Sequence, residues 1–167
     1  MKSFTFTLLT FIALFSINIF GQTPTFAKYS AKVETATAKD INFKSHKDAK
    51  LFRTNLRKSL KEGVNFAGSF VLASWGCGTS CLHSAIIDTK TGNVFFPKEL
   101  EGSSFGFGEL SDKEDSLEFK KNSRLLIING YTGVDNEKDN RKYGIWYYKW
   151  TGKRLKLVKF VKKSETT

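Results

Sequence analysis

The sequence predicts an α+β domain, with one amphipathic helix packed on a meandering antiparallel sheet of about six or seven strands. Apolar side chains recur at helical spacing over residues 46–62, and the period changes to two from residue 66 onward. Two segments, 86–94 and 146–154, repeat a strand, a Thr-Gly turn and a second strand. Such hairpins are typical of propeller blades, but the chain has room for only about two, which excludes a closed propeller.

The helix is predicted over residues 46–62, and Gly63 supplies its stop. Four apolar side chains form its buried face: Ala49, Phe52, Leu56 and Leu60. Ser45 and Asp48 have the spacing of a capping box, in which Ser45 caps the helix and Asp48 reaches back. The opposite face is basic, which suits an anionic partner but is also typical of a solvated helix face.

The strands are predicted at residues 66–75, 82–88, 94–96, 116–119, 124–129, 143–150 and 155–161. Gly92 supplies the positive φ in the turn at residues 89–93. One large aromatic residue, Trp75, ends the predicted strand 66–75. Four more lie in the predicted strand 143–150: Trp146, Tyr147, Tyr148 and Trp150. Two readings follow, a partly exposed binding surface or a core that uses aromatic residues on both faces of a sheet.

The N-terminus predicts export. Lys2, an apolar run over residues 8–20 and Gly21 have the pattern of a secretory signal peptide over residues 1–21. An N-terminal membrane anchor is the alternative, but polar residues interrupt the run. Residues 22–44 are polar and are expected to form a tether to a single globular domain over residues 45–163. We therefore expect a periplasmic or secreted protein without a membrane span after signal cleavage.

The formal charge of the whole chain is +11. In an exported protein this charge favours anionic envelope polymers, acidic proteins or membrane head groups as partners, rather than nucleic acid. A lysine-rich solvated surface would give the same charge.

Cys77 and Cys81 are the only two cysteines, and export favours a disulfide between them. The enclosed loop is short, so the bond contributes roughly 2 kcal/mol and would mainly shape the turn and orient Trp75. A redox role is the alternative, although the C-x₃-C spacing differs from the C-x-x-C of thioredoxin-like proteins. The papain-type cysteine-protease pattern does not fit. Its two cysteines are one residue closer together than Cys77 and Cys81, and it needs a downstream histidine, whereas no histidine follows His83.

The sequence predicts neither a metal site nor a catalytic set. Cys77, Cys81 and His83 are three candidate ligands, but a structural zinc site needs four, and nothing in the sequence brings His46 close. Acidic residues over 135–139 have the spacing of an EF-hand start, without its glycine and final glutamate. No cofactor is expected. The candidate binding residues surround the cysteine turn: Trp75, Gly76, Gly78, Thr79, Ser80 and His83.

Three motifs carry a resemblance to a known group of proteins. They are Asn65-Phe66-Ala67-Gly68 with Phe70, Trp75-Gly76-Cys77-Gly78-Thr79-Ser80-Cys81, and Asp88-Thr89-Lys90-Thr91-Gly92. The chain resembles a family of small exported bacterial proteins of unknown function, with N-F-A-G-x-aromatic, W-G-C-G-T-x-C and D-x-x-T-G motifs. The resemblance extends from the helix to the C-terminus. One difference is position 69, where this chain has Ser69 and similar chains tend to have His. The resemblance implies export and a shared fold, and it implies no activity.

These observations predict an exported, non-enzymatic binding domain that recognises an envelope polymer or a protein partner through a disulfide-braced, glycine-rich turn. One alternative is a thiol-dependent enzyme or redox protein that uses Cys77 and Cys81. Another is an inhibitor or immunity protein that blocks a secreted enzyme.

Overall fold

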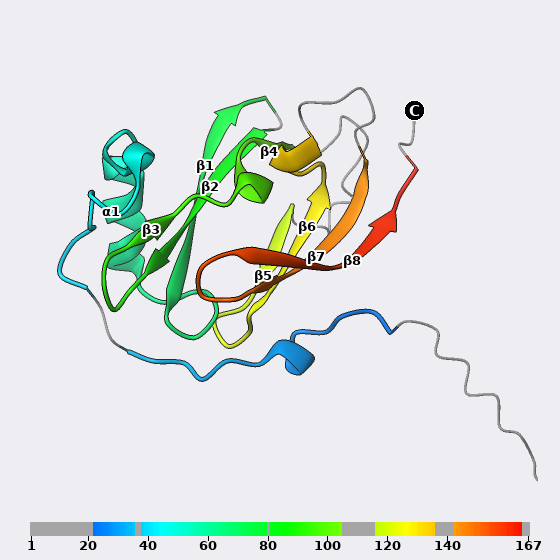
Figure 1. Ribbon diagram of the computed structural model, residues 1–167, viewed down its shortest axis with the longest axis horizontal. Helices are drawn as coiled ribbons and strands as arrows, with labels where there is room; N and C mark the ends of the chain where they lie inside the picture. The colour runs from blue at the N-terminus through cyan, green and yellow to red at the C-terminus, as the bar shows by residue number, and fades with distance from the viewer. Residues whose placement is uncertain (1–21, 36–37, 80, 105–115, 136–141, 165–167) are drawn as a thin grey trace, which may run out of the picture.

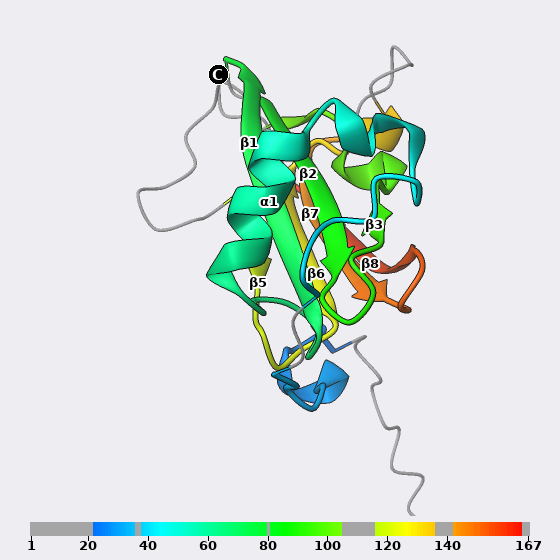
Figure 2. The same ribbon diagram turned by 90° about the vertical axis from the view of Figure 1, so that its left-hand side faces the viewer.

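The protein has three layers, a helix and two stacked antiparallel sheets (Figures 1 and 2). The computed structural model describes residues 22–35, 38–79, 81–104, 116–135 and 142–164. The predicted signal peptide, residues 1–21, lies outside this part of the chain. None of the helices in the described segments has the length and apolar character needed to span a bilayer.

The helix α1 (Arg53–Glu62) covers one face of the first sheet. The first sheet has the order β1-β2-β3 with β4 also paired to β2, and its strands are β1 (Phe70–Gly78), β2 (Cys81–Asp88), β3 (Val94–Phe95) and β4 (Ser103–Ser104). The second sheet has the order β5-β6-β7-β8, from the strands β5 (Leu117–Phe119), β6 (Leu125–Gly130), β7 (Gly144–Trp150) and β8 (Leu155–Lys162). The described segments also contain four short 3₁₀ turns: η1 (Ala27–Tyr29) and η2 (Lys47–Lys50) before α1, η3 (Lys98–Leu100) between β3 and β4, and η4 (Gly133–Asp135) between β6 and β7.

The α+β class is confirmed, whereas the single sheet of six or seven strands is wrong. Strand β1 alternates between two cores: Val71 packs toward α1, and Leu72 packs toward the second sheet. In strand β2, Ile87 likewise packs toward α1 and Ile86 toward the second sheet. A sheet with apolar side chains on both faces needs cover on both. The helix covers one face, and folding the later strands into a second sheet covers the other.

The aromatic residues of β7 lie in the core. Trp146, Tyr148 and Trp150 point toward the first sheet, and the exposed fraction of each is 6% or less. Tyr147 points the other way and is 7% exposed. For these four residues of β7 the second of the two sequence readings is therefore correct, whereas Trp75 on β1 is only half-buried.

The helix predicted over residues 46–62 begins later than expected. A 3₁₀ turn occupies Lys47–Lys50, and the α-helix begins at Arg53. The capping box is wrong, because His46 accepts the hydrogen bond from the Asp48 N–H. The Ser45 hydroxyl instead accepts a hydrogen bond from the Val94 N–H at 2.9 Å, which joins this segment to β3.

The predicted tether runs along the domain. Ser30 forms a bridge with Ser123 beside the second sheet, and the Glu34 N–H donates to the Gly68 carbonyl at 2.8 Å. Asp40 then forms a two-pronged ion pair with Arg57 of α1, with a closest distance of 2.7 Å. This segment therefore links the outer face of the second sheet to the helix (Figure 1).

Candidate functional site

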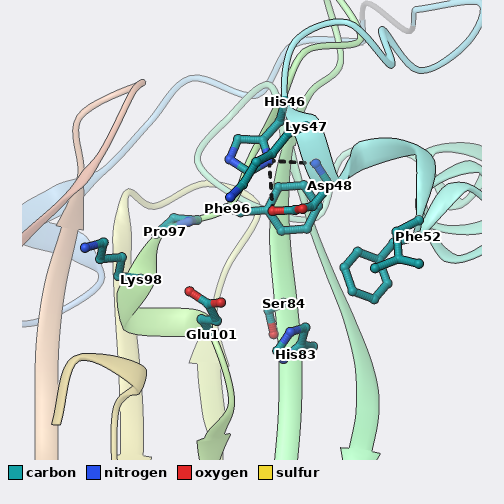
Figure 3. Close-up of a pocket in the computed structure, with 11 residues that line it drawn as sticks. His46, Lys47, Asp48, Phe52, His83, Ser84, Phe96, Pro97, Lys98 and Glu101 are labelled. Atoms are coloured by element: carbon teal, nitrogen blue, oxygen red, sulfur yellow. Dashed lines mark hydrogen bonds and ion pairs between the residues drawn. The ribbon is translucent and has the colours of Figure 1, made fainter. Parts of the chain in front are cut away.

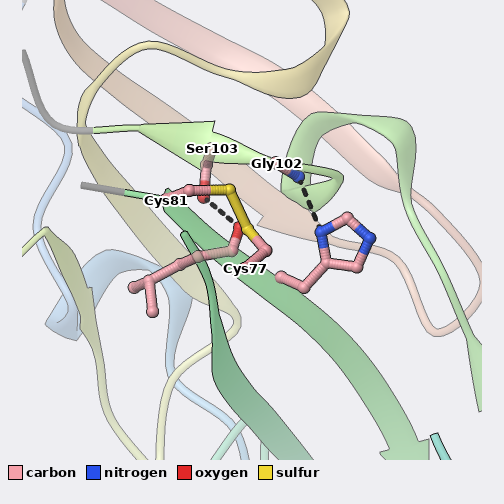
Figure 4. Close-up of a disulfide and its surroundings, with 6 residues drawn as sticks. Cys77, Cys81, Gly102 and Ser103 are labelled. Atoms are coloured by element: carbon pink, nitrogen blue, oxygen red, sulfur yellow. Dashed lines mark hydrogen bonds between the residues drawn. A yellow bond between two sulfur atoms is a disulfide. The ribbon is translucent and has the colours of Figure 1, made fainter. Parts of the chain in front are cut away.

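The β1–β2 hairpin ends in the predicted disulfide, which the structure confirms. Cys77 and Cys81 are bonded with their Cα atoms 5.2 Å apart (Figure 4). The pairing register shifts by one residue between Gly76 and Gly78, so Gly78 pairs with Cys81. The bond therefore closes an irregular end of the hairpin, where the ladder of backbone hydrogen bonds is weakest.

The hairpin tip, here residues 76–79, is exposed to solvent. A Cβ atom added at Gly76 or Gly78 would have no neighbour within 4 Å. Gly78 has a φ of +141°, which favours glycine, whereas Gly76 is required neither by space nor by φ. The tip therefore presents bare backbone and Thr79 to solvent. Ser80, the remaining predicted binding residue of the turn, lies outside the described residues.

Trp75 anchors the hairpin to the rest of the domain. Its ring centroid lies 4.7 Å from that of Phe52, which directly precedes α1. His83, directly opposite Trp75 in the strand register, lies 6.2 Å from it and 5.6 Å from Phe52. The five described residues of the predicted binding set therefore differ in role: Trp75 packs on Phe52, the two glycines and Thr79 are exposed, and His83 lines a pocket away from the tip.

A pocket of about 430 Å³ at the base of the hairpin contains both histidines of the chain. Its walls include six side chains that the close-up shows around the cavity: His46, Asp48, Phe52, His83, Phe96 and Glu101 (Figure 3). Nothing in the sequence brings His46 close to His83, whereas in the structure both line this pocket. The turn η2 carries His46 over β3, where its ring centroid lies 4.7 Å from that of Phe96.

A backbone N–H group contacts one ring nitrogen of each histidine. His83 Nδ1 accepts from the Gly102 N–H at 3.1 Å (Figure 4), and His46 Nδ1 accepts from the Asp48 N–H at 3.3 Å. A nitrogen that accepts a hydrogen bond carries a lone pair, so the proton of the neutral ring is on Nε2. Each ring therefore offers an N–H donor for a ligand. The Asp48 carboxylate lies 3.6 Å from His46 Nδ1.

A second, more open pocket of about 770 Å³ adjoins the first. The two share four lining residues: His46, Phe96, Pro97 and Lys98. The second pocket continues past the amide pair of Asn42 and Asn93, whose side chains are 2.8 Å apart, to the β7–β8 turn with Lys153 and Arg154. Together they form one groove, which we call the histidine groove. Sequence reasoning missed it because its walls come from five separate segments.

Two of the three sequence motifs, at residues 65–70 and 88–92, have structural roles. The Asn65 amide donates to the Leu72 carbonyl at 3.1 Å and accepts from the Leu72 N–H at 2.7 Å, which ties the start of the motif to β1. Gly68, at φ +87°, lies against the Lys32 backbone, where a Cβ atom would clash. Asp88 accepts hydrogen bonds from the Lys90 N–H and the Thr91 hydroxyl, both at 2.9 Å. These residues build turns, so they do not mark the chemistry of the site.

Among the described residues, no group of three or more His, Cys, Asp or Glu side chains is arranged to hold a metal ion. The acidic residues of the EF-hand-like stretch lie in or beside residues 136–141, outside the described side chains. Comparison with models of protein families, with curated proteins and with solved structures finds no match. The function is therefore inferred from the geometry of the hairpin and the groove.

Proposed function

We propose that the protein is an exported, non-enzymatic binding domain that recognises an envelope polymer or a protein partner. Its recognition surface would comprise the hairpin tip and the pocket at its base. The observation that carries this proposal is the exposed tip, closed by the Cys77–Cys81 bond and anchored by Trp75 on Phe52. A surface held rigid before binding loses little conformational entropy when a partner binds.

Export is part of the proposal. The signal-like segment 1–21 supports it, and so does the Cys77–Cys81 disulfide, since such bonds persist in oxidising compartments. The resemblance to small exported bacterial proteins points in the same direction, and we propose membership of that family on its three motifs.

The state of the cysteines favours binding over the thiol-dependent alternative. Cys77 and Cys81 are bonded to each other, and neither carries the thiolate that a nucleophilic mechanism needs. Alkylation of the exported protein without reductant, followed by mass spectrometry, tests this point. We expect no alkylated cysteine, and two alkylated cysteines would favour the thiol-dependent enzyme or redox protein.

A pull-down from envelope extract tests the binding proposal. We expect the exported protein to retain a partner that Thr79→Arg loses, because Thr79 is exposed on the tip and its replacement disturbs no packing. Lys149→Ala, at an exposed position of β7 on the second sheet, is the matched control and should retain the partner. The same retained material for all three proteins, or none for any, would count against the proposal.

A second candidate function, inhibition of a secreted enzyme, is favoured by the shape of the tip. A convex hairpin end with an exposed Thr79 and a local disulfide suits insertion into a concave active site. In that case the retained partner would be an enzyme, and its activity would fall on addition of the wild-type protein but not of Thr79→Arg.

A further inference from the structure

We infer that the histidine groove binds a linear acidic glycan, meaning a chain of sugar rings that carries carboxylate or phosphate groups. This inference rests on the proposed function and names the class of envelope polymer. It uses the groove rather than the hairpin tip, and the two can therefore be tested separately.

The end of the groove near the hairpin suits a sugar ring. Phe52 and Phe96, whose ring centroids lie 5.8 Å apart, are both half-buried and form an apolar wall of the pocket (Figure 3). A sugar ring has an apolar C–H face that can lie on such a wall and a rim of hydroxyl groups that need partners. The carboxylates of Asp48 and Glu101 accept hydrogen bonds from hydroxyl groups, and the Nε2–H of His83 donates one.

The charges in this pocket balance. Two cations, Lys47 and Lys98, face two carboxylates, Asp48 and Glu101, among the residues that line it. A balanced set of donors and acceptors beside an apolar wall favours a neutral, hydroxyl-rich ring over a simple ion.

The other end of the groove is basic. Lys98, Lys153 and Arg154 line it, with Glu99 as the acidic residue among its lining side chains. An arginine guanidinium binds carboxylate or phosphate groups through paired hydrogen bonds. We therefore place the acidic substituent of the glycan at the β7–β8 turn, one or more sugar units away from the aromatic wall.

A chain fits the groove better than a single small molecule does. The two pockets adjoin at four shared lining residues, His46, Phe96, Pro97 and Lys98, and both open to solvent. A linear polymer can enter and leave through such an open groove and contact both pockets at once. The chain charge of +11 also raises the local concentration of an acidic polymer by long-range attraction.

Titration calorimetry with defined probes tests the inference. The acidic probe is a hyaluronan tetrasaccharide, the neutral probe is chitotetraose and the non-sugar probe is a hexapeptide of glutamate. We expect the Kd of the acidic tetrasaccharide to be the lowest of the three. A glutamate peptide that binds equally tightly would show recognition of charge alone and would overturn the assignment to a glycan, and so would the absence of binding by both oligosaccharides.

Charge-reversal pairs locate the binding site. Lys153→Glu with Arg154→Glu should raise the Kd of the acidic tetrasaccharide about tenfold or more. Lys149→Glu with Lys156→Glu gives the same change in net charge on an exposed cross-strand pair outside the groove, and the Kd should change less than about twofold. Equal losses in both double variants would mean that the whole surface charge, and not the groove, binds the glycan.

The aromatic wall has its own test. Phe96→Leu keeps an apolar side chain of similar size and should weaken both oligosaccharides, since both would use the wall. A control measurement is the urea midpoint of unfolding, which should be the same for Phe96→Leu and the wild-type protein. If it is the same and the Kd values of both oligosaccharides are unchanged, the placement of a sugar ring on this wall is overturned.

These outcomes separate the inference from the proposed function. If Thr79→Arg loses a protein partner from envelope extract while no oligosaccharide binds, the proposed function stands and the glycan inference fails. If oligosaccharide binding depends on Lys153 and Arg154 while Thr79→Arg retains all envelope partners, the groove stands and the role of the tip fails.

Discussion

Removal of the disulfide by Cys77→Ser with Cys81→Ser should destabilise the protein modestly and leave its fold intact. The bond joins residues four apart in sequence, so it restricts a very short loop of the unfolded chain. Loop-closure entropy for such a loop corresponds to about 2 kcal/mol at 25 °C. Cys77 is exposed, so its sulfur atom adds little buried surface to this value. For a chain of this length, a loss of 2 kcal/mol lowers the melting temperature by about 4–8 °C.

Urea denaturation measures this loss directly. The midpoint should shift while the m-value stays constant, because the surface exposed on unfolding is nearly unchanged. Wild-type protein treated with reductant should match the double variant, and reductant should have no effect on the variant. A loss above about 4 kcal/mol or a changed m-value would show that the bond holds the core together. A loss below about 0.5 kcal/mol would refute the loop-entropy reasoning.

Three further changes test the turns and the N-terminal segment. Asn65→Ala should lower the free energy of unfolding in urea by about 2–4 kcal/mol, because the buried N–H and carbonyl of Leu72 both lose their partner. The Arg57 guanidinium holds the pKa of Asp40 at about 2, below its usual value of 3.8, so the stabilisation is complete above pH 4 and lost as the pH falls toward 2. Asp40→Asn should remove that part of the acid dependence of thermal unfolding. Gly92→Ala should lower the melting temperature, because its φ is +74° and a Cβ atom would clash with the Asp40 carbonyl.

Local structure could be predicted where a single segment carries the whole signal. The helix around Leu56 and Leu60 follows from apolar spacing, and both side chains are buried on the first sheet. The turn before β3 follows from Gly92, which has the expected positive φ. The disulfide follows from two cysteines in a chain whose N-terminus predicts export. Each of these features depends on neighbours in sequence.

The number of sheets could not be predicted, because it depends on which faces meet. Val71 and Leu72 give one strand apolar side chains on both faces, and this pattern fits a central strand in one sheet as well as a sheet between two layers. The predicted start of the helix was wrong for a related reason. Ser45 has the sequence of an N-cap, but its hydroxyl is taken by the Val94 N–H from β3, 49 residues away.

The cysteine motif and the histidine groove lie in different places for the same reason: the motif is built from neighbours in sequence, and the groove from distant segments. A tight, disulfide-closed hairpin needs glycines and cysteines at fixed spacing, so Gly78 and Cys77 form a pattern that is visible in sequence. A groove needs single side chains from distant segments, and His46, His83 and Arg154 have no mutual spacing to recognise. His46 reaches the groove at the start of η2, where the Ser45 hydroxyl accepts the Val94 N–H of β3. Side chains that line a groove can therefore lie beside a conspicuous motif without being part of it.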